Sequence, residues 1–551
     1  MTRTCKQCST PFEITSEDLQ FYDRFQVPTP EQCPNCRLLR RMQERNAKNL
    51  YYRKCDFTGE EIISQYHSDH PFPVYQSKVW WGDEWDASVY GQDFDFNQAF
   101  FPQFKALKYR TPHMALFIIP GMENSDFTNC TGYLKNCYLI AESDYDEDCY
   151  YSNLLKKCKN VSDCSVCYEC ELCYQCIDCQ NCHNLKFSQD CSSCQDSYFL
   201  RACQNCRDCI GCINQRHKQY MIFNKQYSKE EYEQMKSAMH LDTHSGLEKE
   251  LEEAGALFVT QPHKNLSIEK TENSTGDHLY NAKDAYYCFD CKDIEDCRYC
   301  VKLSLNVKSC MDYSSWGDKT ELVYQSASCG DNAYNIKFCT TCTTNIRDLE
   351  YCDQCTASSD LFGCVGLKRK QYCILNKQYS KEDYFALKQK IIEHMKKTGE
   401  YGEYFPADMC PYGHNETMSQ DFFPLSKEEA LGRGFKWKDE DRSNRYQGTI
   451  PQIPERSSDL PEEITKHILG CKSCGKNYRL ISQEVGFYKM LNVPAPTQCF
   501  DCRHKARIQA RNPFQIWKRT CARCSQDMNT SYAPDRPEIV YCEKCYLETV
   551  Y

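Results

Sequence analysis

Residues 163–182 read DCSVCYECELCYQCIDCQNC and place a cysteine at every third position seven times running, from Cys164 to Cys182. All sixteen cysteines between Cys137 and Cys212 are separated by multiples of three. A longer spacing of 21 residues relates Cys149, Cys170, Cys191 and Cys212. A repeat of about this length, in which each unit contacts only its neighbours, is typical of a solenoid. The stretch therefore predicts a cysteine-rich β-solenoid, with equivalent cysteines stacked in ladders along its axis.

Two interpretations explain why the repeated residue is cysteine. A free thiol behaves as a small, readily buried hydrophobe, which suits a narrow solenoid interior. Facing thiolates also bind zinc or iron–sulfur clusters, and this predicts a metal-storage or thiol-redox protein instead. The regular spacing favours packing, because a metal site does not need a ligand on every rung.

The array is duplicated. CIGCINQRHKQYMIFNKQYSKEEYEQMK (209–236) returns as LFGCVGLKRKQYCILNKQYSKEDYFALK (361–388), 152 residues later. The second array carries twelve cysteines, from Cys288 to Cys373, in a looser register. A helix is expected after each array, capped by Ser228 with Glu231 and by Ser380 with Asp383, and placed to cover the terminal rung. Another short helix is expected at 245–258, with Ser245 and Glu248 as its capping box.

The two ends of the chain carry one module. Residues 5–46 and 471–512 repeat each other at a constant offset of 466, and each copy holds two CxxC pairs separated by 24 residues. The C-terminal copy continues into a second such ribbon, with 17 residues between its pairs. Two CxxC pairs close a tetrahedral thiolate site of the kind Zn²⁺ prefers, whereas a redox CxxC is expected between a strand and a helix. We therefore predict three structural Zn²⁺ sites, at Cys5, Cys8, Cys33 and Cys36; at Cys471, Cys474, Cys499 and Cys502; and at Cys521, Cys524, Cys542 and Cys545.

The second ribbon of the N-terminal module lacks the cysteines of a metal site. At the same offset it carries Cys55, Thr58, Gln76 and Val79, so three ligands are missing. We expect a degenerate ribbon that keeps its fold, with the aromatic stretch 80–101 supplying stability by core packing rather than forming a ligand pocket. His67 and His70 lie in this ribbon and are interpreted as surface-loop residues, with a metal site as the alternative.

The sequence resembles a bacterial domain. The ribbon pattern, with FY and the P-x-P-x-x-C-x-x-C-R turn, is similar to the "probable zinc-ribbon" domain. The motifs WWGDEWD, NKQYSKEEY, FGCVGL and SYAPDRPEIVYCEKCY resemble cysteine-rich proteins of candidate-phylum bacteria, over nearly the whole chain. This resemblance implies zinc at the ribbon cysteines and no particular activity.

Each terminal module also contains a basic segment. Residues 37–54 and 503–519 each carry a net charge of +6 in a chain of net charge −10, which leaves −22 for the rest. A basic helix beside a ribbon is a plausible phosphate-binding footprint, so RNA, DNA or a ribonucleoprotein is the predicted partner. Alternatively, the arginines form ion pairs with acidic residues in the rest of the same chain, face solvent or bind a protein partner. The predicted nucleic-acid-binding residues lie on one helical face in each copy: Arg37, Arg40, Arg41 and Arg45, and Arg503, Arg507 and Arg511.

Together, these observations predict a fold class and a function. The chain begins MTRTCKQC without an apolar run, so no membrane segment or export signal is expected and a reducing cytoplasm is the predicted location. No hydrolase, phosphate-loop, metalloprotease or dinucleotide motif is present, which favours a non-enzymatic protein. We predict a mainly β zinc-binding scaffold that contacts nucleic acid, with the metal-storage or thiol-redox protein and a protein–protein adaptor as alternatives. The expected domains are ribbons at 1–80, an aromatic connection at 81–120, array 1 at 121–222, a helical linker at 223–272, array 2 at 273–375, a helix at 376–400, an irregular connection at 401–462 and tandem ribbons at 463–551.

Overall fold

The computed structural model describes residues 1–119, 121–439, 449 and 453–550. They form two compact units, each assembled from separate parts of the chain. Unit 1 contains residues 1–116, 266–438 and 514–516, and unit 2 contains the described parts of 117–265, 439–513 and 517–550. The N-terminal module is therefore combined with array 2, and the C-terminal module with array 1.

Array 1 is built from parallel rungs of twelve residues. Ser165 pairs with Ile177, and Cys167 with Cys179, in parallel register. Bridges between residues twelve apart continue around the rungs at every third residue. The predicted repeat of about 21 residues is therefore wrong, because cysteines 21 apart lie in different columns. The strands of array 1 are β7 (Glu147–Tyr150), β8 (Asn153–Lys156), β9 (Lys159–Ser162), β10 (Ser165–Tyr168), β11 (Ile177–Gln180), β12 (His183–Lys186), β13 (Gln195–Tyr198), β14 (Arg207–Ile210), β15 (Gln219–Ile222) and β16 (Lys225–Gln226).

The triplet period comes from the backbone. Every third residue from Asn124 to Asp208 has a positive φ, between 43° and 61°, so the chain turns a corner after each short side. A left-handed conformation costs an ordinary L-residue roughly 1–2 kcal/mol, and Asn and Asp tolerate it best. Hydrogen bonds between rungs offset this cost: the N–H of Asp163 donates to the Tyr150 carbonyl at 3.1 Å, and that of Asn153 to the Cys164 carbonyl at 3.1 Å.

The cysteines follow the corner residues and point into the interior, where nearly all are buried. The thiol of Cys176 donates to the carbonyls of Tyr174, at 3.5 Å, and of Leu185, at 3.3 Å. The interior columns are not uniform, because Cys149 pairs with Val161 in the next rung. Apolar residues of similar size therefore exchange with cysteine at interior positions.

Array 2 has rungs of twelve residues at its end and thirteen in its middle. Leu349 pairs with Leu361, twelve residues on, but Val307 pairs with Thr320 at thirteen. The additional residue sits at a corner where two successive residues have positive φ: Leu305–Asn306, Asp318–Lys319, Asp331–Asn332 and Thr344–Asn345. These four insertions explain the looser cysteine register of this array. Its strands are β18 (Ile268–Glu269), β19 (Thr275–Arg298), β20 (Val301–Ser304), β21 (Val307–Gly317), β22 (Thr320–Ala327), β23 (Ala333–Lys337), β24 (Ile346–Glu350), β25 (Ser359–Phe362), β26 (Gln371–Ile374) and β27 (Lys377–Gln378).

The terminal modules have the same elements at the predicted offset of 466. The helix α1 (Ser16–Phe25) corresponds to α10 (Ser482–Leu491), and α2 (Pro34–Gln43) to α11 (Phe500–Ala510). The hairpin of β3 (Tyr51–Lys54) and β4 (Glu61–Ser64) corresponds in register to that of β30 (Trp517–Thr520) and β31 (Asp527–Thr530). Apart from the helices that follow the arrays, the other strands and helices are β1 (Thr2–Thr4), β2 (Pro11–Glu13), β5 (Val74–Tyr75), α3 (Ser77–Trp81), α4 (Phe100–Arg110), β6 (His113–Met114), β17 (Pro262–Lys264), β28 (Leu469–Gly470), β29 (Asn477–Tyr478), β32 (Ile539–Tyr541) and α12 (Glu543–Val550).

Helices follow both arrays, as expected. The helix α5 (Lys229–Ala238) is capped by Ser228 and α7 (Lys381–Thr398) by Ser380. The next helix, α6 (His244–Val259), is capped by Thr243 rather than by the predicted Ser245, which instead donates to Glu455. In the connection after α7, which was expected to be irregular, lie α8 (Met418–Phe422) and α9 (Lys427–Gly432), the latter with a Ser426–Glu429 capping box. The part of this connection at 440–448 and 450–452 lies outside the described residues.

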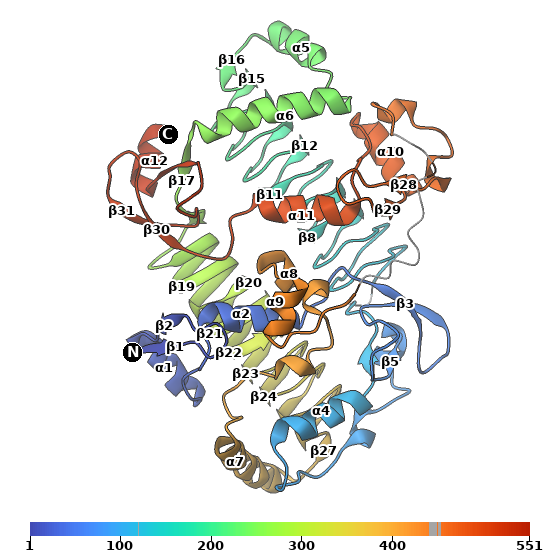
Figure 1. The fold of residues 1–551 in the computed structure, drawn as a ribbon, viewed down its shortest axis with the longest axis vertical. Coiled ribbons are helices and arrows are strands. Elements are labelled where there is room, and N and C mark those ends of the chain that lie inside the picture. Colours follow the sequence, from blue (N-terminus) through green and yellow to red (C-terminus); the bar gives the residue numbers. More distant parts are fainter. Residues whose placement is uncertain (120, 440–448, 450–452, 551) are drawn as a thin grey trace. The chain divides into compact units, whose positions relative to one another are not determined.

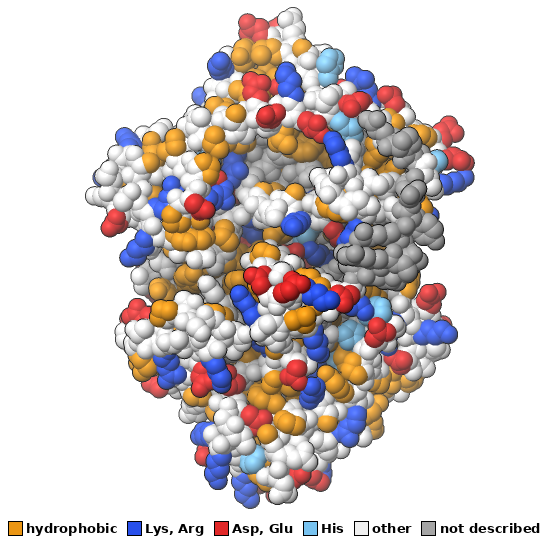
Figure 2. Space-filling model, in the orientation of Figure 1, with side chains coloured by type: hydrophobic (Ala, Val, Ile, Leu, Met, Phe, Trp, Pro, Cys, Tyr) orange, Lys and Arg blue, Asp and Glu red, His pale blue; other side chains and the backbone are white. Residues whose placement is uncertain are grey.

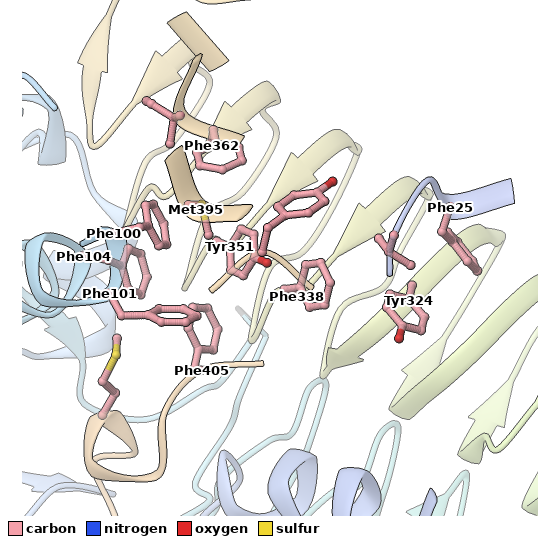
Figure 3. Packing of buried hydrophobic residues seen from close by; sticks show 14 of the residues in the cluster. Phe25, Phe100, Phe101, Phe104, Tyr324, Phe338, Tyr351, Phe362, Met395 and Phe405 are labelled. Carbon is pink, nitrogen blue, oxygen red and sulfur yellow. The ribbon is translucent and has the colours of Figure 1, made fainter. Parts of the chain in front are cut away.

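The interior of array 2 is closed at its last rung by part of the aromatic stretch. Ala87 belongs to the buried interior cluster of array 2, Trp85 packs against that cluster, and the Asn376 amide donates to the Ala87 carbonyl at 3.0 Å. The helix α7 lies instead against the outer face, where Tyr384 and Met395 are fully buried. Figure 3 shows the aromatic column of this face, including Tyr324, Phe338 and Tyr351, packed against Phe25 of α1 and Phe100 of α4.

No helix among the described residues is long and apolar enough to cross a membrane.

Candidate metal centres and the helices that hold them

All three predicted cysteine tetrads are brought together. Within each, the four sulfur atoms lie within 4.8 Å of one another. Distances between two of the sulfurs are 3.7 Å for Cys8–Cys33, 3.7 Å for Cys474–Cys499 and 3.9 Å for Cys524–Cys542. Four thiolates at about 2.3 Å from a tetrahedral Zn²⁺ would be about 3.8 Å apart, so the donor set fits this ion.

Each tetrad is shaped by tight turns that aim backbone N–H groups at sulfur. The turn after the first CxxC pair contains a residue with positive φ, either Ser9, Gly475 or Ser525. The Cys33 N–H donates to the Cys5 sulfur at 3.2 Å, and the Cys542 N–H to the Cys521 sulfur at 3.3 Å. Burial tends to raise the pKa of Cys521, but the N–H groups of Cys524 and Cys542 outweigh it and lower that pKa to about 6. The turn at Cys521 therefore favours the thiolate form that binds metal.

The degenerate ribbon keeps the turn without the tetrad. Gly59 has a φ of 77°, and its N–H donates to the Cys55 carbonyl as in the metal-site turns. The N–H groups of Thr58 and Gln76, at two of the lost ligand positions, still point at the Cys55 sulfur, at 3.5 and 3.3 Å. The fold of a four-cysteine ribbon is thus retained around a single cysteine.

Aromatic packing stabilises this degenerate ribbon. Tyr66 stacks on Tyr412 with ring centroids 5.4 Å apart, and Phe72 stacks on His113 at 4.0 Å. Trp80 is almost fully buried and donates to the Pro112 carbonyl. His70 is held between Tyr66 and Phe72, and burial lowers its pKa to about 3, whereas His67 pairs with Asp69 at 3.0 Å. Neither histidine belongs to a cluster of metal-ligand atoms among the residues that the structure describes.

The predicted nucleic-acid-binding arginines are buried against the arrays. In unit 1, Arg37 and Arg41 both pair with Asp312 of β21, at 2.8 and 3.0 Å. In unit 2, Arg503 and Arg507 both pair with Asp163, each at 2.9 Å. All six of these side chains are at most 4 % exposed.

The two sets of ion pairs also match in their hydrogen bonds. The second guanidinium of each pair also donates to a serine hydroxyl and to a tyrosine carbonyl of its array: Arg41 to Ser314 and Tyr299, Arg507 to Ser165 and Tyr151. Figure 1 shows α2 over the strands of array 2, and α11 over those of array 1. We refer to these two arrangements as the aspartate clamps.

The remaining arginines of the predicted surface are also used within their units. Arg40 donates to the Phe405 carbonyl, Arg45 to the Ser328 hydroxyl at 2.6 Å, and Arg511 pairs with Asp178 at 2.8 Å. The expectation of exposed, phosphate-binding arginine faces is therefore corrected, because buried aspartates and backbone carbonyls take up these cations. On the face drawn in Figure 2, basic and acidic side chains are interspersed. The sequence analysis did not predict a role for Asp163 and Asp312. The pattern that could have identified them is that each follows a tyrosine, Tyr151 or Tyr299, by one rung.

The array thiols form no comparable centre. No three cysteines of either array bring their sulfur atoms within 4.8 Å of one another, in the part of the chain that the structure describes. All 43 cysteines lie in that part, and none forms a disulfide. Burial raises the pKa of Cys191 and Cys291 well above the ordinary value. Hydrogen bonds with neighbouring thiols, that of Cys158 first, instead lower the pKa of Cys170 to about 6.

Comparisons with known proteins identify no family for this chain. No protein-family model matches the sequence, and no curated protein matches it significantly. Among solved structures, one similar chain is described as a "putative acetyltransferase" from Desulfovibrio desulfuricans G20. It is 9% identical, with 48% of this chain and 69% of that chain covered, at a TM-score of 0.11. A likeness at this level supports neither a shared fold nor a shared activity.

Proposed function

We propose that this protein is a non-enzymatic scaffold that binds three structural Zn²⁺ ions in zinc ribbons held on β-solenoid arrays. The observation that carries the proposal is the continuity between metal site and array. The helix α2 begins between Cys33 and Cys36, and α11 between Cys499 and Cys502. The same helices supply the arginines of the aspartate clamps, so each of these two tetrads is joined to its array through one short helix.

A protein partner fits this arrangement better than nucleic acid. The arginines that suggested phosphate binding neutralise Asp312 and Asp163 and hold the modules in place. A scaffold that fixes two ribbon modules by buried ion pairs has the construction of an adaptor, whose exposed ribbon surfaces meet another protein. The metal-storage or thiol-redox alternative has less support, because the array thiols donate to carbonyls and are buried.

The proposal is tested by counting metal ions and thiols on the same sample. Native mass spectrometry of protein purified without added metal is expected to show three zinc ions. The twelve tetrad cysteines of 43 leave 31 thiols. All of these except the partly exposed Cys130 are expected to react with an alkylating reagent only after denaturation. More than three bound metal ions, or array thiols that react in the folded protein, would favour the storage or redox function.

Matched variants assign the ions and test the partner class. Cys8→Ser, Cys474→Ser and Cys524→Ser should each remove one zinc ion, whereas Cys55→Ser should remove none. RNA and DNA oligonucleotides are expected not to bind the wild-type protein at physiological salt. Salt-dependent binding that is lost on substitution of exposed lysines would restore a nucleic-acid function through other residues.

A further inference from the structure

A guanidinium group is built into unit 1 as an internal ligand. Arg298 of array 2 donates from Nε to the Asp18 carboxylate at 2.6 Å and from Nη2 to the Thr15 hydroxyl at 3.1 Å. Its guanidinium lies over the Tyr286 ring, 4.2 Å from the centroid, and near the Tyr299 ring at 5.8 Å. A carboxylate and aromatic faces are the two environments that a planar guanidinium prefers.

The same surroundings recur in unit 2. Asp18 and Thr15 correspond to Glu484 and Ile481 at the offset of 466. In the arrays, Tyr286 and Tyr299 correspond to Tyr138 and Tyr151: each pair lies on adjacent rungs, and the N–H of the second tyrosine donates to the carbonyl of the first. The Tyr299 hydroxyl donates to Asp18 at 3.0 Å, and the Tyr151 hydroxyl donates to Glu484 at 2.6 Å. The backbone N–H groups of Thr15 and Ile481 donate to the same two carboxylates.

The guanidinium itself has no counterpart in unit 2. Tyr150 occupies the position of Arg298, and its ring packs near Phe487 instead, with centroids 6.3 Å apart. No arginine of array 1 therefore reaches Glu484 from the position that Arg298 has in unit 1. A cavity of about 570 Å³ lies beside Glu484, within the range typical of small-ligand sites. Its walls include Glu484, Ile481, Tyr138 and Tyr151, the counterparts of Asp18, Thr15, Tyr286 and Tyr299. Arg503 also lines it, with its guanidinium 5.1 Å from the Tyr151 ring centroid.

The charge of the cavity agrees with its shape. Glu484 is 1 % exposed and forms no ion pair with the described residues; it accepts hydrogen bonds from the Tyr151 and Tyr488 hydroxyls and the Ile481 N–H. Burial raises the pKa of Glu484, and Arg503, which opposes this, is already paired with Asp163. A buried carboxylate without its own cation gains most from an incoming one.

We propose that this cavity of unit 2 binds a ligand bearing a guanidinium group, with Glu484 as its acceptor and the rings of Tyr138 and Tyr151 as its aromatic walls. The exposed Arg479 lines the same cavity. Its charge disfavours a second cation on the ligand and accepts a carboxylate or a neutral tail. A small guanidine and an arginine side chain of a protein partner share this chemistry.

The first experiment titrates the zinc-loaded, full-length protein with three probes in a calorimeter. Ethylguanidinium represents the small-molecule source, N-acetyl-arginine amide represents an arginine side chain, and N-acetyl-citrulline amide is the uncharged control of nearly equal shape. We expect saturable binding of at least one guanidinium probe with a stoichiometry of one and at least tenfold weaker binding of citrulline. Tighter binding of the arginine amide would identify a peptide arginine as the ligand, and tighter binding of ethylguanidinium a small molecule.

Variants connect the binding to the cavity. Glu484→Gln should weaken guanidinium binding at least tenfold, whereas Asp18→Asn in unit 1 should leave it unchanged. Tyr150→Arg supplies an internal guanidinium and should abolish binding while Glu484 is retained. Zinc content of three in each variant shows that the fold is kept. Equal binding by the wild type and Glu484→Gln, equal binding of citrulline, or no binding of either guanidinium probe would overturn the proposal.

A gain-of-site variant gives an independent reading if the unit 2 variants fold poorly. Arg298→Ala empties the corresponding place in unit 1 and leaves Asp18 with the Tyr286 ring. The stoichiometry for ethylguanidinium should then rise from one to two. A stoichiometry that stays at one would overturn the correspondence on which the proposal rests.

Discussion

Unit 1 and unit 2 hold the same module on the same kind of array, but they differ in how the second ribbon is stabilised. Both clamp a helix through two arginines and one aspartate, at Asp312 and at Asp163. The second ribbon of unit 2 has four cysteines, whereas that of unit 1 has Cys55 alone and an aromatic core around Tyr66 and Phe72. One ribbon fold is thus compatible with either support, so a metal ion held by the four cysteines would act on stability rather than on chemistry.

The largest expected effect is the different response of the two second ribbons to removal of metal. A structural zinc site contributes on the order of 10–16 kcal/mol to the folding of a small domain, so a strong chelator should unfold the hairpin of β30 and β31. The matching hairpin of β3 and β4 should stay protected, because its core is aromatic. Hydrogen exchange read by mass spectrometry compares the two hairpins in one sample. Equal loss of protection in both would show that the degenerate ribbon depends on the neighbouring tetrad.

The aspartate clamps should respond alike when each is broken. Asp312→Ala and Asp163→Ala each leave two buried arginines without a counter-ion, which costs about 3–5 kcal/mol. Chemical denaturation should show a loss of this size in both variants, with increased hydrogen exchange in α2 or in α11 respectively. The control Glu169→Ala removes an exposed ion pair with Lys157 and should cost below about 1 kcal/mol. A loss in only one unit would mean that the clamps are not equivalent.

The corners of the two arrays should differ by a smaller amount. Asn332 is the second of two successive left-handed residues in a thirteen-residue rung, and its amide donates to Asn345 at 2.7 Å. Asn184 is a single left-handed corner in array 1 and donates to Asp196 at 2.8 Å. Substitution by Val should cost about 1–2 kcal/mol at either site, with the larger loss at Asn332, because β-branched residues fit this conformation poorly. Urea denaturation of both variants measures the difference, and a larger loss at Asn184 would contradict it.

The smallest effect is expected inside the arrays. Cys176 has Ser188 in the next rung of its column, and the Ser188 hydroxyl donates to a carbonyl two residues earlier, as the cysteine thiol does. Cys176→Ser should therefore cost less than about 1 kcal/mol in urea denaturation and leave the zinc count at three. Cys474→Ser in the tetrad of the same unit should instead lose a zinc ion. Loss of metal from Cys176→Ser would show that the array itself binds it.

Local spacing in the sequence predicted the tetrads and the matched elements, because a CxxC pair fixes its own turn. The triplet period of the cysteines was also readable, but the twelve-residue rung was missed. The cysteines at 158, 170, 182, 194 and 206 did carry that signal, and the 21-residue spacing obscured it. The sequence correctly placed the arginines of each helix on one face, but it could not predict which residues that face contacts. Arg37 and Asp312 are 275 residues apart, and no local pattern relates them.

That separation has a consequence for synthesis of the chain. The N-terminal ribbon module leaves the ribosome long before array 2 exists. At roughly 5–20 residues per second, Arg37 waits about 15–55 s for Asp312. The C-terminal module has no such delay, because Asp163 precedes Arg503 by 340 residues and array 1 is already complete. During translation the first module is thus an undocked domain with its arginines in water, and the last one closes onto a finished surface.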